Sequence, residues 1–162
     1  MNIYTARNIE LNRMKTDNIP DISLFRHHTP VMVRFNDIDI LGHLNNTVYF
    51  SFYDTGKAYY FKAVRGDSMD WKRVDTVIVN VNCAYVNSIV FGDSIEVYTR
   101  CMEIRDKSFR LQQMLVKMPE MTVMSVCETV MVSFDPDTHK STPVSGEWRR
   151  QLEAYEGRSL EA

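Results

Sequence analysis

Residues 35–64 read FNDIDILGHLNNTVYFSFYDTGKAYYFKAV. The second part of this stretch, 46–64, has apolar and aromatic side chains at helical spacing over well over half of the helix circumference. We expect a helix that is buried on most sides, with Asn45 or Asn46 as its N-cap. Gly56 lies in the middle of this helix, where glycine is unfavourable, and it predicts that another part of the chain approaches the helix backbone closely.

The segments around this helix predict β-strands. Residues 29–35 alternate Val31, Val33 and Phe35 on one side, which indicates a strand. After the helix, four further strands are expected within residues 74–87, 95–105, 108–118 and 122–134. The first of them is expected to place five side chains on one face: Val77, Val79, Val81, Cys83 and Tyr85. Short turns between the strands imply antiparallel neighbours, so we predict an α+β fold in which a five-stranded antiparallel sheet wraps around a long central helix.

The chain has 162 residues, and we expect one domain over 1–162. Within it, residues 1–28 are predicted to be an N-terminal extension and residues 29–144 the core. A C-terminal helix is expected at 145–157, with Ser145 as its cap and Gly157 at its end.

Composition excludes several classes of function. A net charge of -2 and 44% hydrophobic residues suggest neither a nucleic-acid partner nor a membrane partner. The N-terminus does not have the pattern of a secretory signal. Cys83, Cys101 and Cys127 are an odd number of thiols within apolar runs, which is typical of a reduced, cytoplasmic protein. The pair His27-His28 has no matching ligand cluster, so we expect no metal and no cofactor.

The polar part of the quoted stretch carries a recognisable motif. Its residues follow the pattern Asp-x-Asp-x-x-Gly-His-x-Asn-Asn-x-x-Tyr, from Asp37 to Tyr49, and the pair Tyr53-Asp54 comes after it on the helix. The motif resembles the opening of the hotdog-fold acyl-CoA thioesterases, the group similar to 4-hydroxybenzoyl-CoA thioesterase. The segments FGDSIEV at 91–97 and DKSF at 106–109 extend the likeness, which covers about residues 29–155.

The resemblance implies hydrolysis of an acyl- or aroyl-CoA thioester, with Asp39 as the working carboxylate. An ionised aspartate can take a proton from water as a general base or attack the carbonyl as a nucleophile. The amides at the start of the helix, around Asn45, Asn46 and Thr47, are expected to polarise the carbonyl oxygen. His43 is the second catalytic candidate, although it is equally able to brace the loop. Asp37 is interpreted as structural.

Substrate contacts are expected from the predicted helix and from a turn between two of the predicted strands. The expected substrate is an acyl-CoA, in preference to an acyl carrier protein, with Tyr49 on the helix as a contact and Asp54 either as a contact or as a solvated position. Arg105, Lys107 and Ser108, at a strand turn, match the region that contacts pantetheine or the nucleotide in relatives, and an ordinary charged hairpin stays open as the alternative. The apolar strand at 76–81 is expected to pair with a second copy, as in relatives, which gives a homodimer or homotetramer.

Other classes fit less well. Enoyl hydratases of this fold resemble Asp-x-Asn-Pro-x-His, which is absent here, and no Gly-x-Ser-x-Gly elbow of a serine hydrolase is present. A non-catalytic protein that binds acyl thioesters stays open as the alternative.

Overall fold

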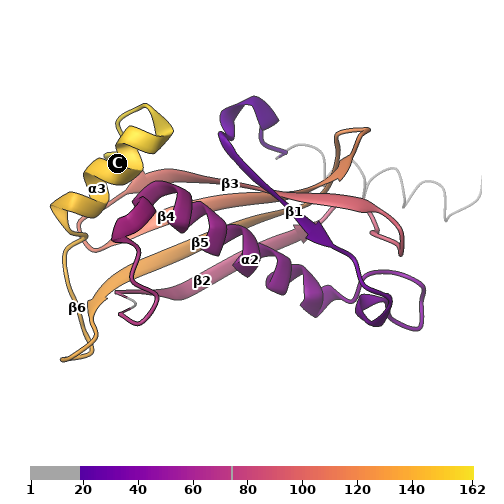
Figure 1. The fold of residues 1–162 in the computed structure, drawn as a ribbon, viewed down its shortest axis with the longest axis horizontal. Helices are drawn as coiled ribbons and strands as arrows, with labels where there is room; N and C mark the ends of the chain where they lie inside the picture. The colour runs from indigo at the N-terminus through magenta and orange to yellow at the C-terminus, as the bar shows by residue number, and fades with distance from the viewer. Residues whose placement is uncertain (1–18, 74) are drawn as a thin grey trace, which may run out of the picture.

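The computed structural model describes residues 19–73 and 75–162. One long helix, α2 (Asn46–Arg65), lies across a curved antiparallel sheet (Figure 1). The sheet has the order β1-β3-β4-β5-β2, formed by β1 (His27–Met32), β2 (Thr76–Tyr85), β3 (Ser94–Ile104), β4 (Ser108–Met118) and β5 (Thr122–Asp135). A short strand, β6 (Lys140–Ser141), pairs with β5. The predicted order of one strand, a helix and four strands is confirmed.

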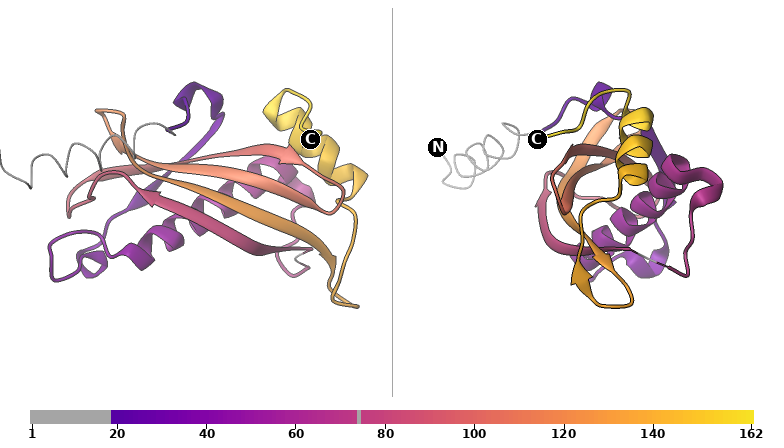
Figure 2. Two further views of the ribbon diagram at one scale, coloured as in Figure 1. Left: turned by 180° about the vertical axis from the view of Figure 1, so that it is seen from behind. Right: turned by 90° about the vertical axis from the view of Figure 1, so that its left-hand side faces the viewer.

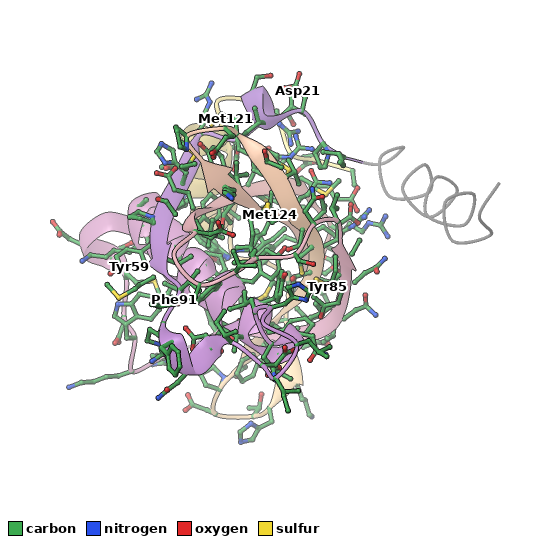
Figure 3. All side chains as sticks on the ribbon, turned by 90° about the vertical axis from the view of Figure 1, so that its right-hand side faces the viewer. Asp21, Tyr59, Tyr85, Phe91, Met121 and Met124 are labelled. Atoms are coloured by element: carbon green, nitrogen blue, oxygen red, sulfur yellow. The ribbon has the colours of Figure 1, made fainter. Side chains whose placement is uncertain are left out.

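Seen end on, the sheet curls around one side of α2 and leaves the other side uncovered (Figure 2). The side that faces the sheet carries a stripe of buried residues three and four positions apart: Tyr49, Phe52, Tyr53, Gly56, Tyr60 and Phe61. Tyr59 on the opposite side is 53% exposed, and Figure 3 shows it away from the core. The sequence therefore overestimated how much of the helix surface is buried, because only one stripe of α2 packs against the sheet.

At Gly56, α2 comes close to the sheet. A Cβ atom at this position would lie 3.0 Å from Val97 Cβ in β3 and 3.1 Å from Gln113 Nε2 in β4. The Gln113 amide donates to the carbonyl oxygen of Tyr53 on α2, at 2.9 Å, and to Thr99 Oγ1, at 3.0 Å. The predicted close approach at Gly56 is confirmed.

The first strand is shorter than predicted. β1 ends at Met32, and Phe35 begins a 3-10 turn, η2 (Phe35–Asp37), where its side chain is 77% exposed. The buried carboxylate of Asp37 accepts a hydrogen bond from the Arg34 N–H at 2.8 Å, which turns the chain out of the sheet direction. Val31, Val33 and Phe35 therefore do not share one strand face.

A β-bulge changes the faces of β2. The pairing with β5 shifts between Ile78 and Asn80, so Val79 has no partner in β5. The extra residue reverses the alternation. Ile78 lies opposite the buried Met131, on the same side as Cys83 opposite Cys127. Val77 therefore lies on the other face, and the prediction of one face from Val77 to Tyr85 is wrong.

The helix α3 (Gly146–Glu156) closes the end of the sheet beyond the C-terminus of α2 (Figure 1). Ser145 Oγ accepts from the Trp148 N–H at 3.2 Å, and Gly157 ends the helix with φ of 68°. Both predicted ends are confirmed. Two further 3-10 turns are η1 (Ile22–Leu24) and η3 (Gly66–Ser68). No helix in the described ranges combines the length and the apolarity needed to cross a membrane.

Candidate active site

A narrow loop, residues 38–44, stands immediately before α2. Ile38 and Leu44 form a β-bridge at the base of the loop, and the Asp39 N–H donates to the His43 backbone oxygen at 2.8 Å. The Gly42 N–H donates to the Asp39 backbone oxygen at 3.0 Å. Gly42 has φ of 79°, a backbone conformation that favours glycine. The loop thereby brings Asp39 and His43 to its base, next to each other.

Asp37 holds this loop in place. Its carboxylate is 3% exposed and accepts from the Arg34 side chain at two atoms, Nη2 at 2.9 Å and Nε at 3.2 Å. These hydrogen bonds from the guanidinium hold the pKa of the Asp37 carboxyl below its usual range. The Asp37 backbone oxygen accepts from the Asn45 N–H at 2.9 Å. Asp37 therefore has the structural role that the sequence indicated.

Asn45 is the N-cap of α2. Its side-chain oxygen accepts two hydrogen bonds from Thr47, from the N–H at 2.9 Å and from Oγ1 at 2.8 Å. The Val48 N–H donates to the Asn45 backbone oxygen at 2.9 Å. Within residues 19–73 and 75–162, the Asn46 N–H has no acceptor. This amide is therefore the unused donor at the electropositive end of the helix.

Asp39, His43, Asn46 and Tyr49 line one open hollow of about 330 Å³. Asp39 is half-buried, whereas His43 and Asn46 are exposed. The Asp39 Oδ1 atom accepts from the Leu41 N–H at 2.8 Å. In the described part of the chain its Oδ2 atom accepts no hydrogen bond, so one carboxylate oxygen is available to a ligand or a water molecule.

The other wall of the hollow comes from the end of β2 and the residues after it, 85–88. Tyr85 donates its hydroxyl to the Asn46 backbone oxygen at 3.2 Å, and its ring meets the Tyr49 ring edge to face at 4.9 Å. Figure 3 looks onto this end of the molecule, where Tyr85 and Phe91 are labelled. Sequence reasoning missed residues 85–88, because their proximity to the loop depends on the sheet register.

Asp54 does not reach this hollow. It lies eight residues beyond Asn46 on α2, which is roughly 12 Å along a helix. Its carboxylate pairs with Lys57 Nζ at 2.8 Å. Both residues line a second cavity of about 220 Å³, whose walls are largely apolar and include Phe61, Trp71, Met131 and Trp148.

Arg105, Lys107 and Ser108 lie at the opposite end of the sheet, the first two in the turn between β3 and β4 and Ser108 at the start of β4. Arg105 pairs with Glu103 at 3.1 Å, and the side chains of Arg105 and Lys107 are exposed. Leu115 in β4 is paired with Ser125 in β5, which is paired with Tyr85 in β2, so Leu115 marks the position of the hollow along the sheet. Ser108 is seven residues away from Leu115 on β4, which corresponds to roughly 23 Å. One copy of the chain therefore does not bring these residues to Asp39. In the described part of the chain, no cluster of three or more His, Cys, Asp or Glu side chains is arranged to hold a metal ion.

Comparison with known proteins identifies the family. The model of the thioesterase-like superfamily matches residues 33–152. The chain belongs to the thioesterase-like superfamily. The long-chain acyl-CoA thioesterase FadM of Escherichia coli strain K12 is 28% identical over 128 residues, which are 77% of this chain and 96% of FadM.

Solved structures of this superfamily share the architecture. A thioesterase from Thermus thermophilus, crystallised with coenzyme A and Zn, superposes with a TM-score of 0.75 at 26% identity, over 84% of this chain and 98% of that one. A 4-hydroxybenzoyl-CoA thioesterase mutant in complex with 4-hydroxybenzoyl-CoA gives a TM-score of 0.67 at 18% identity, over 78% of this chain and 97% of that one. The predicted hotdog fold and the predicted resemblance to thioesterases are confirmed.

Proposed function

We propose that this protein hydrolyses acyl- or aroyl-CoA thioesters to the free acid and CoA, with the reaction at the hollow before α2. The observation that carries the proposal is that Asp39 and Asn46 line the same hollow, and that the Asn46 N–H has no acceptor among the described residues. The relatives support the choice of substrate, since FadM is a long-chain acyl-CoA thioesterase and the Thermus protein was crystallised with coenzyme A.

Asp39 is the proposed general base or nucleophile. Its Oδ1 atom is held by the Leu41 N–H, which fixes the direction of the carboxylate. The free oxygen then either takes a proton from the attacking water or attacks the thioester carbon directly. If it attacks directly, the carbon–sulfur bond breaks, the CoA thiolate leaves, and water hydrolyses the resulting anhydride at Asp39 to the free acid. If it acts as the base, water adds to the carbonyl carbon, the carbon–sulfur bond breaks, and the thiolate of CoA leaves with a proton.

The Asn46 N–H is the proposed donor to the carbonyl oxygen. Negative charge grows on that oxygen as the tetrahedral intermediate forms, and an amide at the first turn of a helix stabilises it. Asn45 and Thr47 contribute by fixing the helix start, since their polar groups are engaged with each other. His43, next to Asp39 at the base of the loop, is proposed to orient the water or the leaving sulfur.

A second copy of the chain is proposed to complete the site. β2 is the last strand of the sheet, and its free edge carries exposed apolar residues, including Ile78 at 44% and Val79 at 55%. Such an edge favours pairing with another strand. Antiparallel pairing of β2 with its copy would put the Tyr85 end of one chain beside the Thr76 end of the other.

That arrangement explains why the predicted substrate contacts are split within one chain. Thr76, at the start of β2, lines the apolar cavity next to Asp54. The register partner of Thr76 is Ser133, whose N–H donates to the Lys107 backbone oxygen. The cavity and the turn with Lys107 therefore both lie at the Thr76 end of β2. In a homodimer, the hollow of one chain would face the second copy's apolar cavity and its turn with Arg105, Lys107 and Ser108. The acyl group would enter the cavity, and the cations would meet the phosphates of CoA.

The alternative is a protein that binds acyl thioesters without hydrolysing them. Turnover separates the two. The purified protein is incubated with a panel of acyl-CoA and aroyl-CoA thioesters, and free thiol is measured over time. We expect hydrolysis of at least one thioester, and Asp39→Asn should lower kcat by at least about 100-fold, on the usual scale of general-base catalysis.

The matched control is Asp67→Asn, the same change at an exposed position at the far end of α2, where turnover should be unchanged. His43→Ala should lower the rate less than Asp39→Asn does. A panel without turnover, together with saturable binding of the same thioesters, would establish the binder. Turnover that Asp39→Asn leaves intact would remove Asp39 from the mechanism.

A further inference from the structure

Two cysteines on neighbouring strands face each other directly. Cys83 in β2 is the register partner of Cys127 in β5, and both are free thiols. The Val86 N–H donates to the Met124 oxygen at 2.9 Å, so Val86 and Met124 form a hydrogen-bonded pair. Pairs alternate along an antiparallel ladder, which makes Cys83 and Cys127, three steps away, a non-hydrogen-bonded pair.

This type of pair has the spacing that a disulfide needs. Directly opposed residues of a non-hydrogen-bonded pair have Cα atoms about 4.5 Å apart, inside the range of about 4.4–6.8 Å for disulfides. The side chains of such a pair also point to the same side of the sheet and are closer than in a hydrogen-bonded pair. No β-bulge interrupts the register between Asn80 and Tyr85. The backbone is therefore already arranged for a bond between the two sulfur atoms.

The two thiols differ in surroundings. Cys83 is half-buried, whereas Cys127 is 1% exposed. The neighbouring Cys127 thiol lowers the pKa of the Cys83 thiol, and this effect outweighs the opposing effect of burial. The neighbouring Cys83 thiol, together with burial, raises the pKa of Cys127. Cys83 is thus the thiol that ionises first and is reached first from solvent.

Cys83 lies near the proposed active site. It packs against the core cluster that contains Tyr49 and Tyr53, and it lies two residues from Tyr85 on the same face of β2. Tyr49 and Tyr85 in turn line the hollow. Because Cys83 is half-buried, it is the member of the pair that a molecule as small as a hydroperoxide can approach.

We infer that Cys83 and Cys127 form an oxidisable dithiol that closes to a cross-strand disulfide when it reacts with a hydroperoxide. The Cys83 thiolate attacks the peroxide, the O–O bond breaks, and Cys83 becomes a sulfenic acid while water or an alcohol leaves. The Cys127 sulfur then attacks the Cys83 sulfur, the S–O bond breaks, and water leaves with the Cys127 proton. The two thiols together lose two electrons, and the peroxide gains them. A low-molecular-weight thiol reverses the bond by exchange.

Cys101 provides an internal control. It lies on β3, is fully buried, and burial raises its pKa to about 12. A pH near neutrality leaves this thiol protonated, so hydroperoxide should not consume it.

The test uses the full chain, reduced and then freed of reductant. Hydrogen peroxide is added in small excess, and the protein is denatured and alkylated before intact-mass and peptide analysis. We expect the number of alkylated thiols to fall from three to one. We also expect a mass loss of about 2 Da, as for one disulfide, that dithiothreitol reverses. Peptide mapping should join Cys83 to Cys127 and find Cys101 alkylated.

Two variants test the order of the steps. Cys127→Ser should stop at the sulfenic acid of Cys83, which dimedone traps, and Cys83→Ser should leave Cys127 and Cys101 both alkylated. Three alkylated thiols in the treated wild-type chain, a bond that includes Cys101, or a bond between the Cys83 thiols of two chains would each overturn the inference. The wild-type measurement decides the matter even if a variant fails to fold, and it does not require thioesterase activity.

Discussion

The contact at Gly56 makes the packing of α2 testable with a single methyl group. In Gly56→Ala, the new Cβ meets the Val97 side chain, with its Cβ at 3.0 Å, and Gln113 Nε2 at 3.1 Å, so these two side chains must shift to make room. Overpacking of this kind costs about 1–3 kcal/mol. Displacing the Gln113 amide weakens its hydrogen bond to the Tyr53 oxygen, which adds about 1 kcal/mol. Alanine is better than glycine in a helix by about 1 kcal/mol, which offsets part of this cost.

The net expectation is a loss of about 1–3 kcal/mol in the free energy of unfolding. Urea unfolding, followed by far-UV circular dichroism at one fixed protein concentration, measures it. With a slope of about 2 kcal/mol per molar urea, a loss of about 2 kcal/mol lowers the midpoint by about 1 M. A matched control is Gly146→Ala at the first residue of α3, where a Cβ meets only the flexible end of Arg150 at 3.3 Å. That variant should unfold at the wild-type midpoint or above it. If Gly56→Ala behaved like Gly146→Ala, the close approach of α2 to the sheet would be refuted.

Two further predictions concern the loop brace and the free edge. Asp37→Asn removes the ion pair with Arg34 from a buried position and should lower the free energy of unfolding by about 1–3 kcal/mol near neutral pH. Because the fold lowers the pKa of Asp37 from 3.8, its contribution is complete above about pH 4 and is lost as the pH falls through the lowered value. The gap between wild type and variant in urea unfolding should therefore narrow below about pH 4, and a gap that widens in acid would contradict the ion pair. Val79→Lys places a charge on the exposed edge of β2 and should convert a dimer to a monomer in sedimentation velocity at micromolar concentration, whereas Met121→Lys, at an exposed position in the β4–β5 turn, should not. A wild-type chain that sediments as a monomer would end the proposal of a shared site.

The start of the central helix could be predicted from the sequence because its signal is local. A cap depends on a few neighbouring residues, and Asn45 supplies the oxygen that the helix amides need. The same holds for Ser145 and Gly157 at the ends of α3. The antiparallel pairing of β3 with β4 and of β4 with β5 could also be predicted, since short turns join these strands.

Other features depend on contacts between distant parts of the chain, and periodicity does not encode them. The bulge at Val79 is visible only against β5, so alternation alone assigned Val77 to the wrong face. The same register brings Cys83 opposite Cys127. The sequence motif placed Asp39, His43 and Asn46 near one another, and they line one hollow. It offered no means to see that Arg105 lies at the far end of the sheet.

Asn45 caps α2 in a way that separates stabilisation of the helix start from binding of a ligand oxygen at the Asn46 N–H. The Asn45 side chain accepts hydrogen bonds from Thr47 and none from the Asn46 N–H. The helix start is therefore stabilised while the Asn46 N–H stays without an acceptor among the described residues. A ligand oxygen that arrives there displaces no internal partner, and its departure leaves no part of the helix to be rebuilt. In the proposed reaction, binding and release at the hollow are thereby uncoupled from fraying of the helix, and the donor is equally available at the start of every cycle.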